Sequence, residues 1–299
     1  MSQLRKGIIA AVWTPTDAAG RILEAELKAN LEFVRRGGVH GLMVLGSTGE
    51  FLHLSIEARK RFLELVQKHA DGLPIIANIS EVNPGVVADL GRHARALGVD
   101  CVSVLPPWYY PVAQDDLVEF FVRAGEASQL PLCLYNFPER TGNRLSLETI
   151  AAVADRVPVA SLKQSGNEFE YHVPLVALAR QKNFVILTVG EIRLVEAMAL
   201  GATGCISGLL NAMPELVKEI YDAVKAGATD RAREATARIQ RVGVLVEALE
   251  FPLNVAAAIE ARGLAVGHPK TPLSAATQAR YAKLVADLRS LYREIGLAG

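Results

Sequence analysis

Short apolar runs alternate with amphipathic stretches along most of the chain, and the alternation repeats eight times. Each run has the length and the aliphatic, often β-branched composition of a buried strand. The stretches between the runs carry apolar residues three and four positions apart, as on one face of a helix, for example over 24–36, 56–69 and 86–97. The predicted strands cover 7–13, 41–45, 74–78, 100–105, 131–136, 157–163, 184–189 and 204–207.

Eight strand–helix units predict an α/β fold, a (β/α)8 TIM barrel. A doubly wound sheet rarely needs eight evenly spaced units. The Gly-x-Gly-x-x-Gly fingerprint of a dinucleotide-binding fold does not follow the first strand. The pattern therefore favours the barrel.

The pattern changes after Gly208, where only helices are predicted. The first of them, over 214–225, completes the outer ring of the barrel. The remaining helices, over 228–249, 252–262 and 274–295, are separated by prolines and form a C-terminal helical appendage. We expect a barrel over 1–225 and a C-terminal extension over 226–299 that packs on the barrel or on another subunit. No flexible linker separates the two.

Composition narrows the class of partner. The chain has 299 residues, of which 51% are hydrophobic, so it can bury a large core as a soluble globular protein. Lys+Arg and Asp+Glu both number 32 and no run of like charge occurs. Nothing therefore attracts the chain to nucleic acid or to a membrane, and we expect small-molecule partners.

The cysteines and the N-terminal stretch indicate a cytoplasmic protein. Cys101, Cys133 and Cys205 are odd in number, far apart and within apolar runs, which is typical of reduced, buried thiols. The apolar run near the N-terminus is followed at once by Thr-Pro-Thr-Asp17 and lacks a small-residue cleavage site, so we expect no signal peptide. No apolar stretch approaches the length of a membrane span.

The strand over 157–163 ends in Lys163, just before a Gln-Ser-Gly loop. A lysine at this junction either reaches water or is forced into a pocket. A buried amine loses hydration, and its neutral form is a nucleophile that can form a Schiff base with a carbonyl substrate. Both interpretations remain open from this stretch alone.

Other polar residues also follow predicted strands, where the active site of a (β/α)8 barrel lies. Gly46-Ser-Thr-Gly-Glu50 is expected to open a helix, either as an ordinary cap or as a site that binds a small carboxylate. Tyr135 can exchange protons near an imine or simply plug the barrel mouth. Arg140 can clamp a second carboxylate or remain solvated. Gly190 and Ser207 follow the last two strands.

Metal chemistry is disfavoured, and no cofactor is expected. The histidines His40, His53, His69, His93, His172 and His268 show no ligand spacing, and none follows a strand where three ligands could converge.

Taken together, these motifs resemble the dihydrodipicolinate synthase and N-acetylneuraminate lyase family of pyruvate-dependent class I aldolases. The resemblance covers almost the whole chain. It rests on Gly46-Ser-Thr-Gly-Glu50, on Tyr135-Asn-Phe-Pro-Glu-Arg-Thr-Gly142, on Leu162-Lys163 and on Gly201-Ala-Thr-Gly-Cys-Ile-Ser-Gly208, in family order and spacing.

By this resemblance, Lys163 attacks the keto carbon of pyruvate or of another 2-oxo acid and expels water to leave a cationic imine. Tyr135 relays protons and Ser47 hydrogen-bonds its hydroxyl. Thr48 and neighbouring N–H groups hold the carboxylate of the 2-oxo acid. Gly190 and Ile206 line the substrate site.

The family completes its hydroxyl chain with a tyrosine from an adjacent subunit, commonly in a homotetramer built as a dimer of dimers. Leu105-Pro-Pro-Trp-Tyr-Tyr-Pro111 has one residue more than the family pattern, so Trp108, Tyr109 and Tyr110 all compete for this place. We favour Tyr109. The alternative is an aromatic plug in a subunit contact.

The second substrate has more than one candidate. An arginine at the position of Arg140 resembles the synthase branch of the family, 4-hydroxy-tetrahydrodipicolinate synthase. In that branch, this arginine binds the carboxylate of aspartate semialdehyde. The Asn136-Phe-Pro138 sequence and the loop over 105–111 also resemble aldolases or dehydratases that act on 2-keto-3-deoxy sugar acids or 4-hydroxy-2-oxoglutarate. Two other classes remain: a phosphate-binding barrel enzyme that uses Gly190 and Ser207-Gly208, and a non-catalytic binder.

Overall fold

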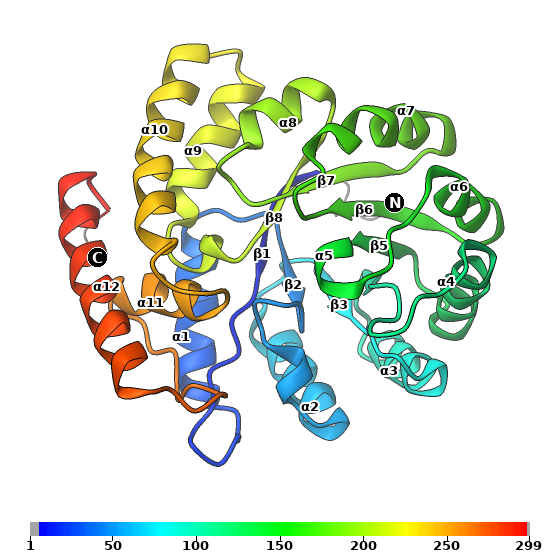
Figure 1. The fold of residues 1–299 in the computed structure, drawn as a ribbon, viewed down its shortest axis with the longest axis horizontal. Coiled ribbons are helices and arrows are strands. Elements are labelled where there is room, and N and C mark those ends of the chain that lie inside the picture. Colours follow the sequence, from blue (N-terminus) through cyan, green and yellow to red (C-terminus); the bar gives the residue numbers. More distant parts are fainter. Residues whose placement is uncertain (1–5, 298–299) are drawn as a thin grey trace.

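Eight parallel strands close into a barrel in chain order, as the sequence predicted (Figure 1). The structure is a computed structural model, and it describes residues 6–297. β1 pairs with β2 on one side and with β8 on the other, which closes the sheet. The strands are β1 Gly7–Ala11, β2 Gly41–Val44, β3 Ile75–Asn78, β4 Cys101–Val104, β5 Leu132–Asn136, β6 Val159–Gln164, β7 Val185–Val189 and β8 Gly204–Ser207.

Helices surround the barrel on the outside (Figure 1). Several carry acidic residues in the first turn and basic residues in the last, which suits the helix dipole. The helices of the ring are α1 Glu24–Arg36, α2 Ile56–His69, α3 Pro84–Ala96, α4 Gln114–Ser128, α6 Leu147–Arg156, α7 His172–Lys182, α8 Leu194–Leu200 and α9 Pro214–Lys225. The four-residue helix α5 Pro138–Thr141 follows β5 and lies inside this ring (Figure 1). Single-turn helices η1 Phe51–His53, η2 Phe169–Tyr171 and η3 Leu209–Asn211 follow β2, β6 and β8.

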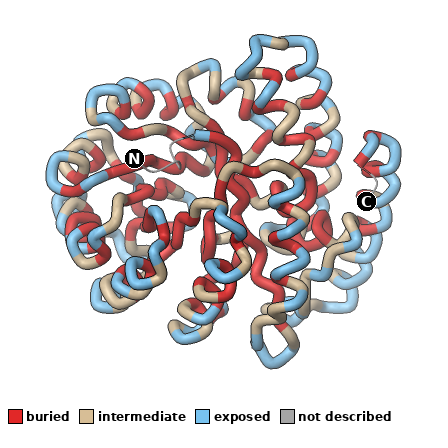
Figure 2. The backbone as a smooth tube through the Cα atoms, turned by 180° about the vertical axis from the view of Figure 1, so that it is seen from behind, coloured by how far each residue is buried: buried red, intermediate tan, exposed pale blue. Residues whose placement is uncertain are grey.

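The core lies in and around the barrel. Almost every strand residue is buried, because side chains alternate between the barrel interior and the layer beneath the helices. The buried backbone therefore concentrates in the centre of the molecule, as Figure 2 shows. This burial on both faces explains why the strands appear in the sequence as continuous apolar runs.

Three further helices follow the ring, α10 Thr229–Val246, α11 Leu253–Ala261 and α12 Ala275–Glu294. α10 packs on α9, and α12 packs on α10 and α11 at the edge of the molecule (Figure 1). The predicted division into 1–225 and 226–299 remains a prediction. Residues 1–5 and 298–299 of these ranges, including the start of the N-terminal stretch, lie outside the described residues.

The segment between α11 and α12 docks on the loop that follows β1. The indole Nε1 of Trp13 donates to the carbonyl of Val266 at 2.8 Å, and the backbone N–H of His268 donates to the carbonyl of Thr16 at 2.6 Å. These bonds bring the far end of the chain to the mouth of the barrel.

One local prediction is only partly right. The motif 46–50 forms a turn that leads into the single-turn helix η1, with Glu50 as its N-cap, and α2 begins only at Ile56. Ser55 caps α2 by accepting a hydrogen bond from the Ala58 N–H. The polar residues Ser47 and Thr48 of the turn are thus not used to cap α2. Over 6–297, no helix is long and apolar enough to cross a membrane.

Candidate active site

Lys163 lies inside the barrel, near the carboxyl end of β6. Its side chain is only 5% exposed, and its Nζ donates a hydrogen bond to Tyr135 Oη at 3.0 Å. The parallel register places Lys163 beside Tyr135 on β5 and Leu187 on β7. Nζ also lies 4.1 Å from the centre of the Tyr135 ring and 4.0 Å from Met43 Sδ. Of the two interpretations of this lysine, the structure supports the pocket.

Lys163 has no counter-ion among the residues that the structure describes. Within residues 6–297, no carboxylate lies within ion-pair distance of Nζ. Buried lysines are almost always paired, because an unpaired buried ammonium is costly. An unpaired buried amine beside a phenol is therefore typical of a functional site rather than of a stabilising contact.

The buried thiols near Lys163 do not compete as nucleophiles. Burial raises the pKa of Cys133, and it raises the pKa of Cys205 and of Cys101 well above the ordinary value. All three are free thiols. They remain protonated, and a thiol is far less nucleophilic than a thiolate.

A cavity of about 280 Å³ opens above Lys163. It brings together seven of the eight residues that the sequence predicted for the site, and Tyr109 is the exception. Its lining is formed by Ser47, Thr48, Tyr135, Phe137, Arg140, Lys163, Val189, Gly190, Ile206, Ser207, Gly208, Leu209, Phe251, Asn254 and Val255.

The turn after β2 forms one wall of this cavity through Ser47 and Thr48. Its end is closed by hydrogen bonds from the Gly49 and Glu50 N–H groups to the carbonyls of Gly46 and Ser47. Among the residues that the structure describes, no acceptor is bound by the backbone N–H groups of Ser47 and Thr48. Adjacent free N–H groups in a turn form a binding site for an anion. The turn can therefore hold a carboxylate.

Close backbone packing fixes this turn. A Cβ on Gly49 would lie 2.9 Å from the carbonyl oxygen of Val12, and a Cβ on Gly208 would lie 2.8 Å from Thr48 Oγ1. Only glycine fits at either position without displacing its neighbours. The loops after β1, β2 and β8 consequently meet at Thr48, which is buried.

A second hollow of about 380 Å³ adjoins the first and shares Ser47, Arg140 and Phe251 with it. Arg140 lies on α5 and is exposed, with its guanidinium 5.9 Å from the centre of the Phe137 ring. Over the described part of the chain, Arg140 forms no ion pair. A free cation at the junction of the two hollows is placed to bind a carboxylate.

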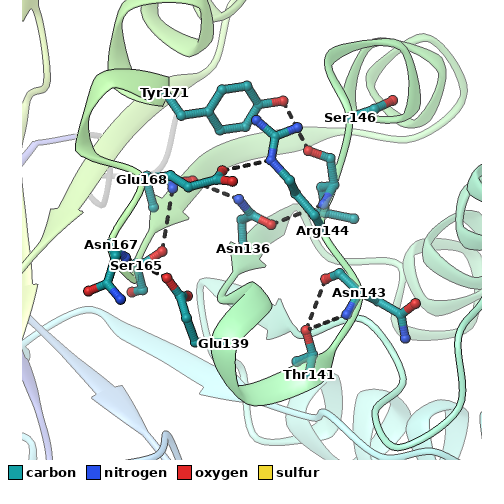
Figure 3. A network of polar contacts seen from close by, with 12 residues as sticks. Asn136, Glu139, Thr141, Asn143, Arg144, Ser146, Ser165, Asn167, Glu168 and Tyr171 are labelled. Carbon is teal, nitrogen blue, oxygen red and sulfur yellow. Dashed lines mark hydrogen bonds and ion pairs between the residues drawn. The ribbon is translucent and has the colours of Figure 1, made fainter.

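A polar network ties the ends of β5 and β6 together beneath α5 (Figure 3). Asn136 donates to Gln164 Oε1 at 2.8 Å and its carbonyl accepts from the Ser165 N–H at 2.9 Å. Glu139 accepts from the Asn167 N–H at 2.6 Å (Figure 3). These bonds hold the strands that carry Tyr135 and Lys163 in register.

Two predicted contacts of the hydroxyl chain are absent from this single chain. In the described residues, Ser47 forms no hydrogen bond with Tyr135, whose Oη accepts from Lys163. Tyr109 lies away from the cavity and is 85% exposed, with a left-handed φ of 81°. Tyr110 is also exposed, whereas Trp108 packs edge-on against Phe51. Tyr109 therefore does not line the cavity of its own chain.

Sequence reasoning missed the contribution of the C-terminal segment. Phe251, Asn254 and Val255 line the cavity above Lys163, although the sequence showed only a proline break at this point. Asn254 donates through Nδ2 to the carbonyl of Val246 at 3.2 Å, so its Oδ1 is the free end of the amide. That oxygen is buried and has no hydrogen-bond partner in the described residues.

Glu191 is a buried acid beside the cavity. Ser207 donates a hydrogen bond to its carboxyl group, and burial raises the pKa of Glu191. The Ser207 hydroxyl is thus already engaged by a carboxyl group, which disfavours phosphate binding at this loop. In the part of the chain that the structure covers, no three His, Cys, Asp or Glu side chains are grouped so as to hold a metal ion.

Comparison with known proteins identifies the family. The Dihydrodipicolinate synthetase family matches residues 4–291. A 4-hydroxy-tetrahydrodipicolinate synthase of Methanothrix thermoacetophila is 30% identical over 282 residues, covering 93% of this chain and 94% of that protein. An uncharacterized DapA-like lyase of Halobacterium salinarum is 32% identical over 289 residues, covering 95% of this chain and 93% of that protein.

Solved structures agree in fold. A prophage protein of the dihydrodipicolinic acid synthase family from E. coli K12, determined in complex with pyruvate, superposes with a TM-score of 0.90 at 26% identity, covering 96% of this chain and 99% of that one. Dihydrodipicolinate synthase from Aquifex aeolicus gives a TM-score of 0.89 at 27% identity, covering 98% of each chain.

Proposed function

Because the chain belongs to the dihydrodipicolinate synthetase family, we propose that it is a Schiff-base lyase or synthase that uses Lys163 to activate pyruvate. The observation that supports this most is the buried, unpaired Lys163 at 3.0 Å from Tyr135. The family consists of pyruvate-dependent lyases and synthases.

In the proposed reaction, the neutral amine of Lys163 attacks the keto carbon of pyruvate, and the carbonyl oxygen leaves as water after accepting two protons. The product is a cationic imine that withdraws electrons from the neighbouring carbon. Loss of a methyl proton then gives an enamine, whose carbon adds to an aldehyde. Tyr135 is the acid–base group within reach of Nζ. Hydrolysis of the imine releases the product and restores the amine.

The carboxylate of pyruvate is proposed to bind at the turn after β2. The free N–H groups of Ser47 and Thr48 and the Thr48 hydroxyl supply the donors. Gly190 and Ile206 line the same cavity. Substrate carbon and nucleophile are thereby held together, which removes much of the entropic barrier.

For the second substrate, we propose aspartate semialdehyde, as in 4-hydroxy-tetrahydrodipicolinate synthase. Arg140 supports this assignment, because it is a free cation at the junction between the lysine cavity and the larger hollow. A carboxylate there would orient an aldehyde toward the enamine. Curated relatives that carry this name cover most of the chain at about 30% identity.

One observation favours a second candidate, an aldolase or dehydratase for 2-keto-3-deoxy sugar acids or 4-hydroxy-2-oxoglutarate. Asn254 Oδ1 is a buried acceptor without a partner in the described residues, and Asn254 lines the lysine cavity. A substrate hydroxyl could supply the missing donor. Steady-state assays with both classes of substrate distinguish the two candidates.

We also propose a cytoplasmic homotetramer in which Tyr109 enters the site of a neighbouring subunit. The exposure of Tyr109 and of the adjacent Tyr110 supports a subunit contact at this loop. The three free, buried cysteines suit a reducing compartment.

Borohydride trapping with pyruvate, followed by peptide mass mapping, tests the chemistry. A reduced pyruvate adduct on Lys163 is expected, and Lys163→Ala should give neither adduct nor turnover while remaining folded. Substantial activity in that variant would exclude the Schiff-base mechanism.

A further inference from the structure

Lys270 forms a buried ion pair with the last residue of the carboxylate-binding turn. Its Nζ donates to Glu50 Oε2 at 2.7 Å and to the carbonyl of Thr14 at 2.8 Å. The side chains of Lys270 and Glu50 are only 5% and 12% exposed. A pair held this far from water is much less screened than a surface pair, and the loss of one partner leaves an uncompensated charge.

The backbone around Lys270 is itself fixed to the barrel. Nζ lies 5.0 Å from the centre of the Trp13 ring, and Trp13 in turn donates to the Val266 carbonyl. Asn30 on α1 donates through Nδ2 to the carbonyl of Ala265 at 3.0 Å. The segment that carries Lys270 is therefore anchored at both the first loop and the first helix of the barrel.

Glu50 transmits this anchoring to the turn. It adopts a left-handed conformation with φ of 53°, and its N–H donates to the Ser47 carbonyl at 3.1 Å. Left-handed backbone is unfavourable for a side-chain-bearing residue, so the surrounding contacts must hold it. Over residues 6–297, Lys270 is the one cation within ion-pair distance of Glu50.

We propose that Lys270 is a positioning residue for the turn that binds the 2-oxo acid carboxylate. Its ammonium holds Glu50 and the Thr14 carbonyl, and thereby fixes Ser47 and Thr48 in the orientation that presents their N–H groups to the cavity. The inference rests on the proposed function, because it assigns these N–H groups to the carboxylate of pyruvate. By this proposal, the C-terminal segment contributes to the binding site, although Lys270 does not contact the substrate.

The test measures the pyruvate concentration that gives half-maximal borohydride trapping on Lys163. In Lys270→Met, which keeps the length of the side chain and removes the charge, this concentration should rise about tenfold or more, since small misplacements of binding groups have effects of this order. The extent of trapping at saturating pyruvate should be unchanged, because Lys163 and Tyr135 are untouched. Lys270→Arg, which keeps the charge, should recover most of the loss.

Lys182→Met is the matched control, because Lys182 forms its ion pair with Asp155 at the protein surface. It should leave the half-saturating concentration unchanged, which would show that the loss of a lysine charge elsewhere has no effect on trapping. A loss of folded protein in Lys270→Met would instead lower the extent of trapping at saturating pyruvate. Thermal melting by circular dichroism confirms that each variant is folded. If Lys270→Met does not fold, Glu50→Gln, which removes the partner charge and keeps the shape, replaces it with the same expectation.

The two levels of the proposal fail differently. Suppose that the unsubstituted protein forms the adduct, but that folded Lys270→Met, or Glu50→Gln in its place, keeps the same half-saturating concentration. This result overturns the positioning role alone. No adduct in the unsubstituted protein overturns the proposed function and the positioning role with it.

Discussion

At the scale of single residues, burial decides which groups do chemistry. Lys163 is an amine without a counter-ion in the described residues, next to a phenol and a thioether. The charged form of such an amine is poorly solvated, whereas the neutral form is an effective nucleophile. The same barrel interior keeps its thiols protonated. Lys163, the proposed nucleophile, therefore has no competitor in these thiols.

Arg140→Ala is expected to separate the two substrates. The half-saturating concentration of a carboxylate-bearing aldehyde should rise by roughly one to two orders of magnitude, because a charge-assisted bond of about 1.5–3 kcal/mol is lost. Pyruvate trapping on Lys163 should be unaffected. Arg156→Ala, at a surface ion pair with Glu119, is the control. A loss of pyruvate binding instead would mean that Arg140 belongs to the pyruvate subsite.

Glu191→Gln should change the pH dependence of stability. Burial raises the pKa of Glu191 in the folded protein above its ordinary value of 4.5. The stability that this group contributes is therefore complete below its unfolded pKa and is lost as pH rises through the folded pKa. The glutamine variant should be more stable than the parent at neutral and alkaline pH, with the difference vanishing in acid.

The measurement is the free energy of unfolding by urea across that pH range. Glu196→Gln, at an exposed ion pair with Arg193, serves as control. If the free energy of unfolding had the same pH dependence in the parent and in Glu191→Gln, the raised pKa of Glu191 would be contradicted.

The site residues that could be predicted from the sequence differ from those that could not in whether they depend on long-range contacts. Lys163 and Tyr135 each follow from their place at the end of an apolar strand, and seven of the eight predicted residues line one cavity. Asn254 and the Glu50–Lys270 pair depend on contacts between segments far apart in the chain. No local pattern encodes such a contact.

At the scale of elements, the turn after β2 shows where local signals mislead. Gly46-Ser-Thr-Gly-Glu50 has the composition of a helix cap, but Ser55 provides the cap of α2. Ser47 and Thr48 line the cavity instead, and Glu50 pairs with Lys270. The strands and most helices were predicted to within a few residues, because their hydrophobic periods follow directly from burial.

Gly49→Ala tests the close packing of this turn. The added Cβ would lie 2.9 Å from the Val12 carbonyl oxygen, so the turn must shift. We expect a destabilisation of about 1–3 kcal/mol and weaker pyruvate trapping. Gly46→Ala is a control in the same turn, since its Cβ would contact the Met43 side chain at ordinary distances, of which the shortest is 3.5 Å to Cε. Equal effects of the two substitutions would argue against a specific constraint at Gly49.

At the scale of the whole molecule, the site of one chain lacks a group that the proposed relay requires. Tyr109 is an exposed residue with left-handed backbone in the loop after β4. The sequence could not show that Tyr109 lies away from the cavity of its own chain, because the position of a loop residue depends on tertiary and quaternary contacts. It did predict the closed barrel, since eight similar units admit few other arrangements.

Assembly and activity should therefore be coupled. Sedimentation equilibrium should show an oligomer, and Tyr109→Phe should reduce turnover without changing the oligomer, because only a hydroxyl is removed. Tyr110→Phe is the matched control on the neighbouring residue. A fully active monomer would exclude a residue shared between subunits.

The pairing of β1 with β8 also determines when the barrel can close during synthesis of the chain. On the ribosome, β1 emerges first and cannot close the barrel until residue 207 has been made. The cavity still lacks Phe251, Asn254 and the anchor at Lys270 at that moment. The complete site therefore forms only after the segment that carries Lys270 has been made, more than 250 residues after β1.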